Sequence, residues 1–380
     1  MTDPAGGFFT SQDADSDGVE GEYYVWSKQE IFSVFGPNEG ARFCNYFGMT
    51  DEGNFEGKNI LFVDTNFTES DGHKPSIQNP EILPEGWREK LLMVRNAREA
   101  PLRDEKILTS WNALMLTSFA EASAVLDKNE YLQIAIRNAE FLLENMWRDG
   151  RLYRTFSSEG PGLKGYLEDY SFLIYGLTVL YEVSFQRKWL DIAVDLAASM
   201  TDLFLDPTTN VFYDTGSDHE DLIVRPRDIF DNAMPCGGSV AVFSLLRLGL
   251  LTGSEHYQKI IEQNINSVFQ LMIRFPVGFG NWICATDFYF GSVKEIGLVG
   301  NMLDNEFRQL FRSLHERFMP NKLIAGYDPK KPQDADGIPL IEGRAMVNGA
   351  PSAYVCENYS CLFPVNDVQS LKEQLGMTVD

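Results

Sequence analysis

The sequence repeats a pair of helices from Asp104 onward, and this repeat leaves few folds open. Apolar residues recur there at helical spacing, in pairs of segments whose first members begin near Asp104, Tyr166 and Asp231. The period is about 60 residues, the length of two long helices with their loops. In each pair the first helix is apolar around most of its circumference and the second has a polar face, so the first should lie inside. We therefore expect a mainly α fold, an α/α toroid.

The segments that follow the helix pairs have a different pattern. Residues 151–154 and 211–214 mix aromatic and polar side chains in the manner of short hairpin strands. Linkers of this kind should lie at one end of the toroid.

The last quarter has the pattern of a small α/β unit. Apolar runs at residues 293–299 and 322–327 flank an amphipathic helix at 304–318, which predicts a βαβ arrangement. Residues 353–361 read as one further strand, and Asp367 is placed to cap a terminal helix. We expect two domains, a toroid over residues 1–290 and an α/β appendage packed on it over residues 291–380.

The N-terminal third is less periodic. It predicts a strand at residues 23–26, helices at 27–35 and 38–47, and an exposed loop at 65–84, where Asn, Asp, Ser, Gly and Pro are frequent.

Charge and composition exclude several classes of protein. Thirty-two basic side chains against 55 acidic ones give a net charge of -23, which would repel a nucleic acid backbone. The longest uncharged apolar stretch, residues 171–181, is too short to cross a bilayer. We expect a soluble, cytoplasmic chain with neither nucleic acid nor a membrane as its partner.

The cysteines and histidines give no metal-binding pattern. The five cysteines form no CxxC pair, and there are only four histidines to complete a zinc set. We therefore expect a reducing compartment and no metal or other cofactor. Cys356 and Cys361 lie on one expected strand, where two small buried side chains are favoured over a redox couple.

Four motifs resemble those of a known family. They are GGFFTSQDADS at residues 6–16 with EGEYYVW at 20–26, DEKILTSWN at 104–112, GYLEDY at 165–170, and AYVC at 353–356 with Cys361. Over nearly the whole chain they resemble the thioredoxin domain-containing family that includes spermatogenesis-associated protein 20 and the bacterial YyaL-like proteins. The chain departs from the family pattern at Ala113, Asn232, Cys236 and Gly238, where Gly, Gly, Ser and Asn are usual.

The resemblance implies a thioredoxin-like domain followed by an α/α toroid of the six-hairpin glycosidase and N-acylglucosamine 2-epimerase type. The residues present here match only the later part of that pattern. The resemblance therefore implies an N-terminally incomplete toroid, a fragment of a longer protein with a thioredoxin-like domain before it.

Polar residues recur where the inner helices are expected to begin. Because those helices point the same way in a toroid, their first residues should meet at one opening and form a pocket. The acids expected there, for acid–base work or for binding hydroxyl groups, are Asp104, Glu168, Asp169 and Asp231. The side chains expected to hold a sugar-like ligand beside them are Lys106, Trp111, Asn112, Tyr170 and Asn232. A second interpretation is that Asp104, Asp169 and Asp231 only cap helices.

An acidic run at residues 13–18 resembles the first half of a calcium loop and contains Asp13 and Asp15. Position twelve counted from Asp13 is Tyr24, whereas a calcium loop requires a bidentate Glu there. A hydrogen-bonded loop at the mouth of the toroid is therefore favoured over a metal site. Tyr24 and Trp26 are expected to line the same mouth.

Two functions from different classes remain. One is a carbohydrate-active enzyme, either glycoside hydrolase-like or sugar isomerase-like. Epimerase chemistry needs histidines, and none of the four stands at an expected inner-helix start. The other is a noncatalytic scaffold or recognition module that accompanies the thioredoxin-like domain, with its acids paired or capping helices and no free cavity.

Overall fold

The chain forms two compact units in the computed structural model, which describes residues 1–63, 86–220, 222–358 and 360–377. The larger unit comprises Met1–Thr10 and Lys106–Asp380, and the smaller comprises Ser11–Glu105. Each unit has a hydrophobic core of its own. The loop expected at residues 65–84 lies outside the described residues, and the domain boundary expected at residue 290 stays a prediction.

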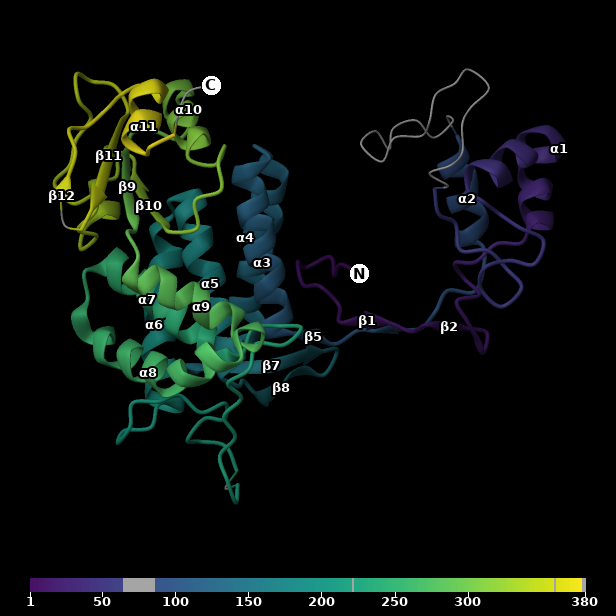
Figure 1. Cartoon of the computed structure of the whole chain (residues 1–380), viewed down its shortest axis with the longest axis horizontal. Helices are drawn as coiled ribbons and strands as arrows, with labels where there is room; N and C mark the ends of the chain where they lie inside the picture. The colour runs from purple at the N-terminus through teal and green to yellow at the C-terminus, as the bar shows by residue number, and fades with distance from the viewer. Residues whose placement is uncertain (64–85, 221, 359, 378–380) are drawn as a thin grey trace. The chain divides into compact units, whose positions relative to one another are not determined.

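Helix pairs dominate the larger unit (Figure 1). The helices are α3 (Thr109–Val125), α4 (Asn129–Met146), α5 (Leu167–Ser184), α6 (Arg187–Phe204), α7 (Gly237–Thr252), α8 (Gln258–Arg274) and α9 (Gly280–Phe290). Helices α3, α5, α7 and α9 pack side by side as an inner layer, while α4, α6 and α8 each pack on their preceding partner. Nearly all of α5 is buried, whereas α6 keeps a polar outer face. These findings confirm the mainly α, toroid-type fold.

Short strands and single-turn helices connect the helix pairs. Between α4 and α5 the chain forms β6 (Trp147–Arg148), β7 (Arg151–Ser157) and β8 (Gly160–Lys164), and β7 also pairs with β5 (Ile107–Leu108). The hairpin expected at residues 151–154 is therefore present. The linker at 211–214 makes only a single bridge, from Leu205 to Phe212. Among the described residues, 3₁₀ turns lie at Glu255–Tyr257 between α7 and α8, at Pro276–Gly278 between α8 and α9, and at Pro332–Ala335 after β10.

The C-terminal part of the larger unit is a four-stranded sheet with two helices. Its elements are β9 (Lys294–Val299), α10 (Asn305–Ser313), β10 (Lys322–Tyr327), β11 (Ser352–Glu357), β12 (Ser360–Cys361) and α11 (Val368–Gln374). The strand order is β10-β9-β11-β12, with β9 and β10 parallel across α10, as the sequence predicts. Asp367 caps α11 by accepting the N–H of Ser370, also as expected.

The prediction of one strand over residues 353–361 is wrong, and with it the prediction of two independent cysteines. The segment is a hairpin in which Cys356 and Cys361 lie directly opposite each other, with Cα atoms 4.0 Å apart, and form a disulfide. On one straight strand, five residues would separate them by about 17 Å. The turn at Asn358, where φ is 49°, brings them together.

A buried ion pair joins the sheet to the inner helices. Glu182 near the end of α5 pairs with Arg247 of α7, and both side chains are almost fully buried. Glu182 also accepts the backbone N–H of Ile324 at 3.2 Å, and Arg247 donates to the carbonyl of Lys322. Because each charge has a partner, breaking the pair would leave an uncompensated buried charge.

The smaller unit packs two helical segments around Trp87. It contains β1 (Ser11–Gln12), β2 (Asp15–Ser16), β3 (Val19–Glu20), β4 (Arg103–Asp104), α1 (Lys28–Tyr46) and α2 (Trp87–Asn96). Gly36, with φ 77°, interrupts α1 before Pro37, so the two expected helices are both present. The strand expected at residues 23–26 is wrong: residues 21–24 form turns, and only Trp26 makes a bridge, to Asn59.

Crossing a bilayer requires a long, apolar helix, and none of the helices in the described ranges has that combination of length and composition.

Candidate functional site

A pocket lies where α5 and α7 begin. Its volume is about 450 Å³, within the range of small-molecule sites. The lining residues are Arg154, Tyr166, Glu168, Asp214, Thr215, Pro226, Asp228, Phe230, Asn232, Ala233, Met234, Pro235, Cys236 and Gly237. Glu168 and Asn232 are the expected site residues among them.

An ion pair forms one wall of this pocket. Arg154, on β7, donates to Glu168 in the first turn of α5 at 2.6 Å, and also reaches Asp169 at 3.2 Å. The guanidinium lies over the ring of Tyr166, 4.9 Å from its centroid. Arg154 thus joins the hairpin to the start of α5 and also lines the pocket.

Asp214 places a carboxyl group with a raised pKa in the pocket. Its backbone is fixed on both sides, since its carbonyl accepts the N–H of Leu167 at 2.9 Å and its N–H donates to Pro226 at 3.0 Å. Its side chain accepts the N–H of Asp228 at 2.7 Å. Burial raises the pKa of Asp214 to about 6, and the negative charges of Asp228 and Glu168 act in the same direction.

Asp169, by contrast, is fully buried and does not line the pocket. One carboxylate oxygen accepts the N–H of Ser110 at 3.0 Å, and the other accepts the N–H of Tyr166 at 2.8 Å together with Arg154. Burial raises the pKa of Asp169 to about 6, against the opposing effect of the Arg154 charge. This geometry matches the helix-capping interpretation, with Asp169 as the reciprocal cap of α5.

Asp231 likewise uses both oxygens to fix helix starts. One oxygen accepts the N–H of Cys236 at 3.0 Å and the hydroxyl of Ser239 at 2.8 Å, at the start of α7. The other accepts the N–H groups of Asn281 and Trp282, at 2.8 and 3.2 Å, in the first turn of α9. A single carboxylate therefore ties two inner helices together.

Two further predicted residues of the larger unit, Asn112 and Tyr170, are buried and hydrogen-bonded to the backbone. Asn112, almost fully buried, brackets Phe8 by accepting its N–H at 2.8 Å and donating to its carbonyl at 3.0 Å. Tyr170 is fully buried, and its hydroxyl accepts hydrogen bonds from Arg151 and from the N–H of Leu152.

Trp111 and Lys106 belong to the larger unit but do not line its pocket. Trp111 is 41% exposed on α3. The carbonyl of Lys106 accepts the N–H of Thr10.

The remaining predicted residues lie in the smaller unit: Asp13, Asp15, Tyr24, Trp26 and Asp104. Tyr24 and Trp26 line an apolar cavity of about 310 Å³ within that unit. Asp104 pairs in register with Ser11. The roles predicted for these five residues stay predictions.

The sequence interpretation missed five polar pocket residues: Arg154, Tyr166, Asp214, Thr215 and Asp228. A signal for two of them was present, because Arg154 and Asp214 end the two aromatic-polar linkers. The helix repeat drew attention to residues inside the helices, whereas the linkers between them supply most of the lining.

His219 lies next to the pocket, packed on Tyr166 with ring centroids 5.2 Å apart. Its Nδ1 accepts the N–H of Gly216 at 2.9 Å, and its Nε2 lies 3.4 Å from the carbonyl of Lys164. Both ring nitrogens therefore have backbone partners. Within the described ranges, no three or more His, Cys, Asp or Glu side chains are placed to hold a metal ion.

Comparison with known proteins shows what the chain is similar to. No family model matches it. It is 29% identical to spermatogenesis-associated protein 20 of Homo sapiens and 28% identical to that of Mus musculus, over 98% of its own length. The chain is homologous to spermatogenesis-associated protein 20. The expected resemblance is thus confirmed, and the chain spans about half the length of these relatives, since the alignments cover 52% of each.

Several solved structures show a partial likeness to the chain. A cellobiose 2-epimerase of Bacillus thermoamylovorans has a TM-score of 0.36 at 18% identity, covering 43% of this chain and 45% of the epimerase. A GH76 α-mannanase of Bacteroides thetaiotaomicron has a TM-score of 0.41 at 14% identity, covering 57% of this chain and 59% of the mannanase. Likenesses of this degree carry no conclusion about activity.

Proposed function

We propose that the pocket binds a neutral sugar-like molecule and that the chain is a carbohydrate-active enzyme in which Asp214 moves a proton. The observation that carries the proposal is the carboxyl group of Asp214, with a pKa raised to about 6, in an open pocket beside the Arg154–Glu168 pair. A group with such a pKa both gives and takes a proton near neutral pH.

The lining favours a neutral polyhydroxylated ligand. Arg154 contributes one positive charge, whereas Glu168, Asp214 and Asp228 contribute three carboxyl groups, so an anionic ligand such as a sugar phosphate would be repelled. Phe230, which is 42% exposed, offers an apolar ring on which a sugar face can pack. The carboxylates beside this ring can accept hydrogen bonds from the hydroxyl groups of a sugar, and the guanidinium can donate hydrogen bonds to them.

Hydrolase-like chemistry is favoured over isomerase-like chemistry. A hydrolase of this kind needs two carboxyl groups, one of which donates a proton. Asp214 suits the proton-donating role, and Glu168 is the second carboxyl group in the same pocket. Isomerisation through histidines has less support, because both ring nitrogens of His219 already face backbone partners.

A noncatalytic recognition module is the second candidate, and a specific observation favours it. Asp169 and Asp231 have both oxygens engaged at helix starts, as that interpretation expects. In this version the module accompanies a thioredoxin-like domain in the full-length cytoplasmic protein, and the pocket recognises a ligand without turning it over. Neither candidate has a nucleic acid or a membrane as its partner.

A ligand screen with matched variants tests the proposal. The purified chain is melted with a panel of neutral mono- and disaccharides, aldonates and sugar phosphates, and compounds that stabilise it are followed by NMR for hydrolysis or for exchange at C2. We expect neutral sugars to raise the melting temperature and sugar phosphates to have no effect. Asp214→Asn should retain binding and lose at least about 100-fold in turnover, the scale of general acid catalysis.

Asp195→Asn is the matched control. It removes the same charge from an exposed position on the outer helix α6 and should behave as the wild type. If a compound binds and is not turned over, the result favours the recognition module and contradicts the enzyme. If no compound stabilises the chain, or if Asp214→Asn turns over as fast as wild type, the enzyme proposal is wrong.

A further inference from the structure

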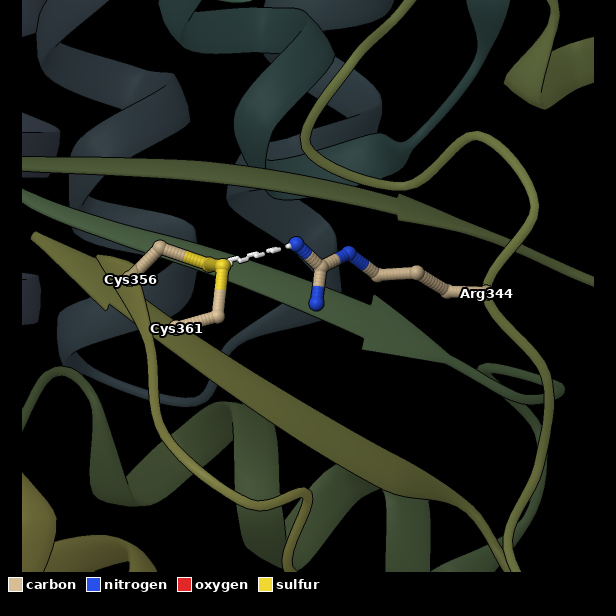
Figure 2. Close-up of a disulfide and its surroundings, with 3 residues drawn as sticks. All are labelled: Arg344, Cys356 and Cys361. Carbon is tan, nitrogen blue, oxygen red and sulfur yellow. Dashed lines mark hydrogen bonds between the residues drawn. A yellow bond between two sulfur atoms is a disulfide. The ribbon is translucent and has the colours of Figure 1, made fainter. Parts of the chain in front are cut away.

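The disulfide between Cys356 and Cys361 lies at the edge of the C-terminal sheet, in an element that the pocket does not use (Figure 2). Cys356 is on β11, and Cys361 is on β12, the last strand of the sheet. Cys361 is exposed, whereas Cys356 is 4% exposed. A thiol arriving from solvent therefore meets Cys361 first.

A guanidinium group is directed at both sulfur atoms. Nη2 of Arg344 lies 3.2 Å from Sγ of Cys356 and 3.0 Å from Sγ of Cys361, as Figure 2 illustrates. The side chain is held in place by the ring of Tyr354, 4.6 Å from the guanidinium carbon, and the Arg344 carbonyl accepts the hydroxyl of Tyr327. A neutral disulfide gains little from a cation, but a thiolate gains a great deal, because positive charge lowers the pKa of a thiol.

The bond is poorly placed to serve as a structural crosslink. It joins residues five apart that already face each other across a hairpin. The backbone holds the same region without it: Leu362 donates to Val355 at 2.9 Å, and Ala353 and Val365 exchange two hydrogen bonds. In the chain-entropy account, crosslinks that close the shortest loops stabilise least.

We propose that Cys356–Cys361 is a redox-active disulfide that takes two electrons from a dithiol, with Arg344 as the positioning cation for the departing thiolate. A thiolate of the dithiol attacks Sγ of the exposed Cys361, and the bond to Cys356 breaks. Cys356 leaves as a thiolate beside Arg344. The second thiolate of the dithiol then attacks its own partner sulfur and releases Cys361.

The exchange balances in atoms and electrons. The dithiol is oxidised to a disulfide, the chain gains two thiol groups, and the two protons of the dithiol pass to these thiols or to solvent. The reaction needs no metal or other cofactor, and it is independent of the pocket and of the function proposed for it.

The first experiment measures reduction of the folded chain. Thiols are counted by mass after alkylation, before and after treatment with dithiothreitol in native buffer. We expect three reactive or denaturant-released thiols before treatment, from Cys44, Cys236 and Cys284, and five afterwards with an unchanged melting temperature. Five thiols before treatment, or a disulfide reduced only after denaturation, would overturn the proposal.

The second experiment tests Arg344 through the rate. Arg344→Gln should slow reduction by dithiothreitol about fivefold, because the leaving thiolate loses its cation, and Arg344→Lys should restore most of the rate. Arg312→Gln, which removes an exposed arginine on α10, is the matched control and should leave the rate unchanged. A purely structural Arg344 would give the opposite result, since loosening the hairpin would speed reduction.

The third experiment tests which of the two cysteines reacts first with an external thiol or disulfide. In a Cys284→Ser background, needed because Cys284 is also exposed, Cys356→Ser should take one glutathione from oxidised glutathione rapidly on Cys361, whereas Cys361→Ser should react slowly because Cys356 is buried. Equal rates in the two variants would contradict the assigned order of steps. The double variant, with both Cys356→Ser and Cys361→Ser, should have the melting temperature of the wild type. This control shows that a loss of exchange does not come from a loss of folding.

Discussion

Two aspartates beside the start of α5 show how the same side chain takes different roles. Asp169 follows Leu167 on α5, and Asp214 accepts the N–H of Leu167 through its backbone carbonyl. Burial raises the pKa of both carboxyl groups to about 6. Asp169 uses both oxygens on backbone N–H groups and Arg154, whereas Asp214 faces the pocket. A perturbed pKa therefore marks a candidate site only when the group can also reach a ligand.

The first prediction is a stability difference that grows with pH. Because the pKa of Asp214 is raised, the folded chain holds this proton to a higher pH than the unfolded chain does, so the free energy of unfolding falls as the pH rises through about 6. Asp214→Asn does not titrate and escapes this loss. Relative to wild type, the variant should gain about 1 kcal/mol between about pH 5 and pH 7.5, allowing for solvent screening of a partly exposed group.

Urea unfolding at both pH values measures this gain, with Asp195→Asn, which removes the same charge from an exposed position on α6, as the control. A constant difference between Asp214→Asn and wild type would mean that Asp214 titrates normally. If Asp214→Asn gains stability and loses turnover, Asp214 contributes to function at a cost in stability.

At the residue scale, the expected site residues that begin neighbouring helices face different partners. Glu168 and Asn232 line the pocket beside the starts of α5 and α7. Asp169 and Asp231 stand in the same turns but point at backbone N–H groups. Helical spacing fixes which turn a residue occupies, but the choice between capping and facing a ligand depends on neighbours from distant segments.

At the element scale, close contact between the first turns of α5 and α7 shapes the pocket. Gly237 opens α7, and a Cβ atom there would lie 2.9 Å from the backbone N and 3.2 Å from the Cα of Glu168. Neither atom can move without moving the helix start. Because Gly237 has no side chain, the start of α7 can lie directly against Glu168. This contact fixes the position of the pocket wall that carries Glu168.

The second prediction follows from that contact. Gly237→Ala should lower the free energy of unfolding by about 1–3 kcal/mol, the usual cost of overpacking, and should weaken binding of any pocket ligand because Glu168 is displaced. Gly280→Ala is the matched control, since Gly280 opens α9 and a Cβ there would meet nothing within 4 Å. Thermal and urea unfolding compare the two variants. Equal stability would show that the helix starts can separate freely.

Element types are predicted well where a pattern is long and poorly where it is short. The helix pairs and the parallel βαβ unit persist over many residues, so their periodicity identifies them. Residues 353–361 are too few to show whether a run of apolar side chains turns back on itself. The hairpin, and the disulfide that depends on it, could therefore not be read from spacing alone.

At the scale of the whole molecule, the smaller unit is inserted into the larger one. The chain leaves the larger unit after Thr10 and returns at Lys106, and the N–H of Thr10 donates to the carbonyl of Lys106 at 3.0 Å. The first residues belong to the helical core: Phe8 stacks on Phe119 of α3, with ring centroids 5.7 Å apart. Periodicity reports which face of a helix is buried but not which helices share a core, so the sequence did not reveal this division.

The last prediction tests this architecture by removing the inserted unit. Deleting residues 11–105 and joining Thr10 to Lys106 through a short Gly-Ser linker should leave a chain that melts cooperatively, close to the temperature of the full chain, because the joined ends are already adjacent. The matched control begins at Lys106 and also lacks residues 1–10. It should lose about 2 kcal/mol or more relative to the joined deletion, because the buried amide of Asn112 loses both hydrogen bonds to Phe8. Circular dichroism and urea unfolding compare the two deletions. A joined deletion that fails to fold, or a control of equal stability, would mean that the segments before and after residues 11–105 do not form one structural unit.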